Sequence, residues 1–98
     1  MSYIYRLSKS SRKNKKYCIT TPEGLKIHFG QKGASDFTQH KDPDRKYRYI
    51  LRHQKRENWS KSGIRSSGWW SRWLLWEKPT LAQARRNIEQ KFNIDIIV

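Results

Sequence analysis

Hydrophobic and polar positions alternate with a period of two over the first third of the chain. Residues 3–8 and 25–29 both alternate in this way, and residues 17–21 between them are β-branched and aromatic. A Pro-Glu-Gly turn separates the last two segments. Because neighbouring side chains of a strand point to opposite faces, the pattern predicts an antiparallel β-meander over residues 1–30.

The hydrophobic period then changes to that of an α-helix. Asp42 followed by Pro43 is typical of a helix start, with Asp as the N-cap and Pro at the first helical position. The spacing predicts a basic amphipathic helix over residues 42–56. Its predicted apolar face carries Pro43, Tyr47, Ile50, Leu51 and Gln54, and the opposite stripe carries Arg45, Arg48, Arg52 and Lys55.

A second helical region is predicted at residues 66–92. Its first part is the densest aromatic stretch of the chain and indicates a short Trp-rich helix, which Pro79 ends. Thr80 and Gln83 then have the spacing of a capping box, which predicts a C-terminal helix. Residues 94–98 are expected to form a short closing strand.

The chain length of 98 residues indicates one small domain, residues 1–98, of the α+β class. We expect an N-terminal antiparallel β-meander followed by two or three short helices. Hydrophobic residues make up only 35% of the chain, so the core should be thin, but five Trp and five Tyr argue against disorder. The single cysteine excludes a disulfide framework, and no apolar run suits a signal peptide or a membrane span. We therefore expect a soluble intracellular protein.

The sequence offers no recognisable catalytic or metal-binding arrangement. His28, His40 and His53 do not have the spacing of zinc ligands, and no carboxylate lies in a motif with a histidine or a second carboxylate. Two glycines near residue 30 lack the spacing of a phosphate-binding loop. We expect a non-enzymatic protein with no metal, no cofactor and no small-molecule substrate.

The strongest compositional signal is the excess of positive charge. Lys and Arg number 22 against 8 Asp and Glu, which gives a formal net charge of +14. Such a surface suits nucleic acid, which would bind in a salt-dependent way, and equally suits an acidic protein surface. The candidate electrostatic residues are Arg12, Lys13, Lys15, Lys16, Arg45, Arg48, Arg52, Lys55, Arg56, Arg65 and Arg72.

The tryptophans could serve several roles. A thin core short of aliphatic residues favours burial of Trp70 and Trp73. Four Trp in one short helix do not all fit a thin core, however, and exposed Trp beside Arg is typical of a protein-contact hot spot. The rings could also form a membrane-interface anchor or a stacking platform for bases. The candidate partner-binding residues are Trp59, Trp69, Trp70, Trp73 and Trp76.

Four segments of the chain carry a resemblance to a known family. They are HFGQKGASDFT at 28–38, HKDPDRKYRYILRH at 40–53, ENWSKSGI at 57–64 and GWWSRWLLWEKPTL at 68–81. These segments resemble small, basic, mostly uncharacterised proteins of the nucleocytoplasmic large DNA viruses, including chlorella-virus, mimivirus and marseillevirus relatives. The resemblance supplies no catalytic residues to carry over.

The resemblance implies a protein of the virion, or of the host cytoplasm or virus factory during assembly. We expect a minor capsid or cement protein that binds major and other minor capsid proteins on the inner capsid lattice through Trp anchors and a basic surface. The alternative is a sequence-nonspecific DNA-binding protein of the virion core or virus factory. An anionic membrane surface is a further possible partner.

Overall fold

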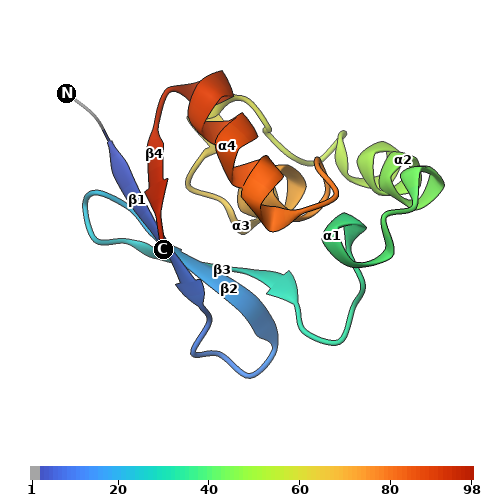
Figure 1. Cartoon of the computed structure of the whole chain (residues 1–98), viewed down its shortest axis with the longest axis horizontal. Helices are drawn as coiled ribbons and strands as arrows, with labels where there is room; N and C mark the ends of the chain where they lie inside the picture. The colour runs from blue at the N-terminus through green and yellow to red at the C-terminus, as the bar shows by residue number, and fades with distance from the viewer. Residues whose placement is uncertain (1–2) are drawn as a thin grey trace.

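The computed structural model describes residues 3–98, and it has the α+β architecture that the sequence predicts. Strands β1 (Ile4–Lys9), β2 (Lys15–Thr20) and β3 (Lys26–Gln31) form the antiparallel meander. Strand β4 (Asp95–Ile97) pairs in parallel with β1, so the sheet has the order β3-β2-β1-β4 (Figure 1). The predicted closing strand is thus confirmed, and it joins the sheet beside the first strand.

The helices lie between β3 and β4 in the chain. They are α1 (Phe37–His40), α2 (Pro43–His53), the 3-10 turn η1 (Lys61–Gly63), α3 (Ser67–Trp70), its π-helical continuation η2 (Ser71–Leu75) and α4 (Leu81–Phe92). Asp42 caps α2 with Pro43 in the first turn, as predicted. At α4 the Thr80 half of the predicted capping box forms, in which the Thr80 hydroxyl accepts a hydrogen bond from the Gln83 backbone amide. Helix α2 ends at His53, three residues before its predicted end, and α1 and η1 were not predicted.

The core lies between one face of the sheet and the segment formed by α3, η2 and α4. Trp69 and Trp70 are fully buried there, and Trp70 packs against Tyr5 and Phe29 of the sheet. Ile88 of α4 is also fully buried. The opposite face of β1 is exposed. The tryptophans thus supply much of the apolar volume that the few aliphatic residues cannot.

Helix α2 lies at the far end of the molecule's long axis from β1 and β4 (Figure 1). The predicted packing face of this helix is wrong: Tyr47 and Leu51 are 62% and 45% exposed. Tyr49 is the buried residue, and its ring stacks in parallel on Trp76 with centroids 4.3 Å apart. The His53 ring also contacts Tyr49, with ring centroids 4.3 Å apart. This aromatic stack, rather than the aliphatic residues, sets the rotation of α2.

Candidate functional site

The acidic side chains of the chain are largely used to stabilise the fold. Asp36 pairs with Lys16 at 2.7 Å, and Glu77 lies 2.8 Å from Arg72. The remaining roles of this kind are the ion pairs Glu77–Lys46 and Glu23–Arg65, the N-cap Asp42, and Glu89, which accepts a hydrogen bond from the Ile96 amide. Because few carboxylates remain to neutralise the surface, most of the formal charge of +14 faces solvent.

The cations of α2 and of the turn after it form the largest unpaired group. Arg45, Arg48, Arg52, Lys55 and Arg56 are all exposed, and none of them makes an ion pair with a carboxylate among residues 3–98. At 3.6 residues per turn, the three arginines of the helix lie along one side of it. The sequence predicted this basic stripe, and the structure places it along a hollow in the surface.

That hollow, which we call the arginine pocket, has a volume of about 500 Å³ and is lined by Ala34, Ser35, Arg45, Arg48, Arg52 and Trp76. One wall is the basic side of α2, and the other is the segment that links β3 to α1. Trp76 is half-buried at the boundary. Arginine presents five N–H donors in a planar fork that matches the oxygens of a phosphate or carboxylate. The pocket is therefore suited to an anion.

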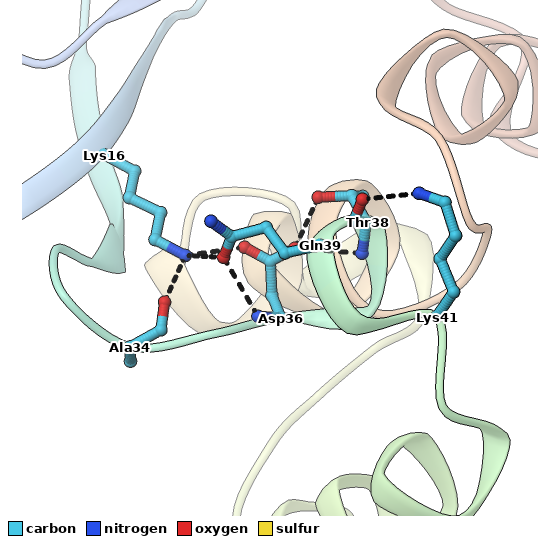
Figure 2. Close-up of polar contacts among 6 residues, drawn as sticks. All are labelled: Lys16, Ala34, Asp36, Thr38, Gln39 and Lys41. Carbon is cyan, nitrogen blue, oxygen red and sulfur yellow. Dashed lines mark hydrogen bonds and ion pairs between the residues drawn. The ribbon is translucent and has the colours of Figure 1, made fainter.

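The wall opposite α2 is held in place by Lys16 (Figure 2). The Lys16 ammonium donates hydrogen bonds to the Ala34 carbonyl at 2.5 Å and to the Asp36 carboxylate at 2.7 Å. A third bond reaches the Gln39 amide oxygen at 2.9 Å. Asp36 is the N-cap of α1, and its carboxylate also accepts hydrogen bonds from the backbone amide and the hydroxyl of Thr38. Lys16, a predicted binding cation, thus shapes the wall of the pocket from within the fold.

A second hollow, which we call the polar cavity, adjoins the arginine pocket. It has a volume of about 280 Å³ and shares Ala34, Ser35 and Trp76 with its neighbour. Its other walls come from the ends of β2 and β3, from α2, and from α3 with η2. Burial raises the pKa of the Tyr49 phenol, on the wall of the cavity, well above its usual range, as does the charge of Glu57. Tyr49 therefore keeps its proton at neutral pH.

The hairpin between β1 and β2 adds further positive charge. Arg12 and Lys13 are exposed, and Lys15 is half-buried on the wall of the polar cavity. Partial burial lowers the pKa of His28, and the charges of Arg12, Lys26 and Lys15 lower it further. The positive charge of this end of the sheet thus adds to the effect of burial on the pKa of His28.

Two of the predicted surface cations have other roles. Arg72 is only 9% exposed, and its guanidinium stacks on the Trp73 ring with 4.6 Å between charge centre and ring centroid. Burial alone would raise the pKa of the Glu77 carboxyl, but the hydrogen bond and charge of Arg72, with smaller contributions from Lys46 and Lys78, bring it below the ordinary value. Arg65 is exposed but paired with Glu23 at 3.1 Å. Arg72 is therefore a structural residue rather than a binding one.

Three of the five candidate partner-binding tryptophans lie in the core: the burial favoured for Trp70 and Trp73 is confirmed, and the contact surface considered for Trp69 is corrected. Trp69 and Trp70 are fully buried and Trp73 is 9% exposed. Each of their indole N–H groups donates to a backbone carbonyl of the preceding loop: Trp69 to Ser60 O, Trp70 to Ile64 O and Trp73 to Trp59 O, at 2.7–3.0 Å. These rings fill the core and fix the loop before α3. Trp59 and Trp76 are half-buried.

Within residues 3–98, no group of three or more His, Cys, Asp or Glu is placed to hold a metal ion. None of the helices in that part of the chain is long and apolar enough to cross a membrane. Cys18 is buried in β2 with its sulfur 4.0 Å from the His28 ring. The candidate site is defined by the exposed, unpaired cations of α2 and the arginine pocket beside them.

Comparison with known proteins gives one match. A family model described as a family of unknown function (DUF5754) matches residues 5–53, which is half of the chain. No curated protein and no solved structure matches the chain. The matched residues include β1 to α2, and therefore both walls of the arginine pocket, while Trp76 lies outside them.

Proposed function

Because the chain belongs to DUF5754, a family of unknown function, we propose a function from its own surface: it binds nucleic acid without reading the sequence, through contacts to phosphate. The observation that carries this proposal is the row of exposed, unpaired arginines on α2 that lines the arginine pocket. A helix face stabilised by its own ion pairs would pair its cations with carboxylates three or four residues away. Here the acidic residues that α2 carries, Asp42 and Asp44, lie at its N-terminal end.

Phosphate is the most suitable anion for this surface. Guanidinium groups bind phosphate oxygens in pairs, and the hairpin cations Arg12, Lys13 and Lys15 extend the positive surface beyond α2. Phosphate contacts fix a protein on nucleic acid but carry no sequence information. The binding is therefore expected to be sequence-nonspecific and strongly dependent on salt.

The setting that we propose is a large DNA virus. The resemblance of residues 28–81 to small basic proteins of those viruses supports the virion core or the virus factory as the place of action. Burial of Trp69, Trp70 and Trp73 removes three of the five aromatic anchors on which a capsid contact was expected to depend, and this favours the nucleic-acid role.

The test is fluorescence anisotropy with labelled DNA over a range of salt concentrations. The triple variant Arg45→Ala/Arg48→Ala/Arg52→Ala removes the basic wall of the arginine pocket. Each lost phosphate contact should lower the slope of log K against log salt by about 0.7 on single strands and about 0.9 on duplex, so the slope should fall by roughly 2–3. The control is Lys26→Ala/Lys61→Ala/Arg86→Ala, which removes the same charge from exposed positions elsewhere. Equal losses in both variants, or binding insensitive to salt, would refute the proposal.

A minor capsid role is the second candidate, with its contact surface moved away from the tryptophans. Tyr3, Ile4, Ile97 and Val98 are 39–80% exposed, and they lie on or beside the paired strands β1 and β4. Exposed apolar side chains of this kind suit a protein partner. Mass spectrometry of opened virus particles separates the two roles. Recovery with the major capsid protein at a fixed ratio supports the minor capsid role. Recovery with the genome, and release from it as salt rises, supports nucleic-acid binding.

A further inference from the structure

The polar cavity differs in chemistry from the arginine pocket that it adjoins. Its volume of about 280 Å³ lies just below the range of roughly 300–1,000 Å³ that is usual for ligand pockets. Aromatic surface comes from Tyr49 and Trp76, and polar groups come from His53, Glu57 and Ser71. Because Tyr49 and Trp76 stack on each other, one face of each ring is covered. The remaining aromatic surface with a few hydrogen-bonding groups is suited to a small heterocycle, whereas the arginine pocket is suited to an anion.

Close packing of Gly68 against Glu57 and a π-helical turn shape the wall of the cavity. Gly68 and Glu57 both line the cavity, and any side chain at position 68 would overlap the Glu57 carboxylate. The π-helical segment η2 begins at Ser71, on the cavity wall, and ends at Leu75, which also lines it. Short π-helical segments are frequent at functional sites because the wider turn displaces side chains from their α-helical positions.

We propose that the polar cavity receives the base of an unpaired nucleotide whose phosphate lies in the arginine pocket. The proposal rests on the proposed function and adds to it a preference for single strands. The two hollows share Ala34, Ser35 and Trp76, so an anion in one and a base in the other lie on either side of the same short segment. A paired and stacked base in a duplex cannot enter such a cavity without leaving its stack.

The groups in the cavity also indicate which bases it favours. The Glu57 carboxylate makes no ion pair among residues 3–98, and an ionised carboxylate only accepts hydrogen bonds. Carboxylates accept from the exocyclic amino group of cytosine. Thymine has no exocyclic amino group, so cytosine should bind more tightly than thymine at this one position.

The test compares a labelled twelve-nucleotide oligo-dC strand, an oligo-dT strand and a twelve-base-pair duplex at one salt concentration. Ser71→Leu places a larger side chain in the cavity, and Ser8→Leu makes the same change on the exposed side of β1. The unmodified protein should bind oligo-dC about tenfold more tightly than duplex. Ser71→Leu should remove that difference while the affinity for duplex and its salt slope stay unchanged, and Ser8→Leu should change neither.

A second variant keeps the proposal testable if Ser71→Leu does not fold. Glu57→Gln keeps the shape of the side chain and should abolish the preference for oligo-dC over oligo-dT. Equal affinity for strands and duplex, unaffected by either cavity variant but still lowered by loss of the arginines, would overturn the cavity proposal and leave the proposed function standing. Displacement of the strand by dCMP at the same nucleotide concentration would show that a free nucleotide, and not a strand, is the ligand. That result would also overturn the cavity proposal.

Discussion

Replacement of Lys16 by methionine tests whether one half-buried ammonium group holds the wall between the two hollows. The side chain of Lys16 is 14% exposed and that of its partner Asp36 is 5% exposed. Methionine has a similar length and keeps the apolar part of the contact, but it donates no hydrogen bond. The variant therefore removes the bonds to Ala34, Asp36 and Gln39 and leaves the packing nearly intact.

The size of the effect follows from what remains around Asp36. Removal of one partner of a buried ion pair costs about 3–5 kcal/mol, because the other charge is left without a counter-charge. Thr38 still donates to the Asp36 carboxylate from its amide and its hydroxyl, so the low end of that range, about 3 kcal/mol, is expected. For a domain of this size, such a loss corresponds to a fall in Tm of roughly 12–24 °C.

Urea denaturation of Lys16→Met, Asp36→Asn and the double variant measures the coupling between the two side chains. We expect a coupling free energy of about 2 kcal/mol, within the range for contacting groups. Lys15→Met is the matched control, since Lys15 is the adjacent residue and pairs with no carboxylate in the described chain. It should change stability by less than about 0.5 kcal/mol. A coupling free energy below about 0.5 kcal/mol would show that the pair is screened by solvent and would refute the reasoning.

Three further changes test the core, a glycine and a carboxylate. Trp70→Ala should destabilise the fold by about 3–5 kcal/mol in thermal or chemical denaturation, as expected for a fully buried ring. Gly30→Ala should cost more than Gly33→Ala, because both have positive φ but only at Gly30 would the new Cβ lie 2.8 Å from Leu75. The pKa of Glu77 lies below its ordinary value of 4.5, so its ion pairs add stability above that pH and lose it as the pH falls through the lowered pKa. Glu77→Gln should therefore lower stability at pH 7 and flatten its decline in acid, in urea titrations between about pH 7 and 3.

The elements of the fold that local signals define were predictable from the sequence. The alternation of residues 3–8 and 25–29 gave the strands, and Asp42 and Thr80 marked the helix starts correctly. These signals work because a cap or a period-two pattern acts within a few residues. Helix α1 was missed, although Asp36 and Gln39 make a capping box around its first turn. That pattern was the one local signal from which it could have been found.

The candidate site was only partly predictable, because long-range contacts decide which side chains face solvent. The basic stripe of α2 was predicted correctly. Its position beside a pocket depends on the stacking of Tyr49 on Trp76, a contact that no local sequence pattern encodes. One short helix was predicted for the Trp-rich segment, whereas its second part, η2, is π-helical and shifts the residues after Trp70 around the axis. The pairing of Lys16 with Asp36 likewise joins residues that are 20 apart in the chain.

Burial of the tryptophans and exposure of the arginines are linked by the energetics of a small, highly charged domain. A net charge of +14 on 98 residues destabilises the compact state through self-repulsion, and the few aliphatic residues supply little apolar area to oppose it. Large aromatic rings bury more area per residue, and here their N–H groups also fix the loop before α3. If the arginines served only solubility, acidic neighbours would relieve the repulsion at no loss of function. Their concentration along one pocket, with the carboxylates used elsewhere in the fold, is the arrangement on which the proposed phosphate-binding role rests.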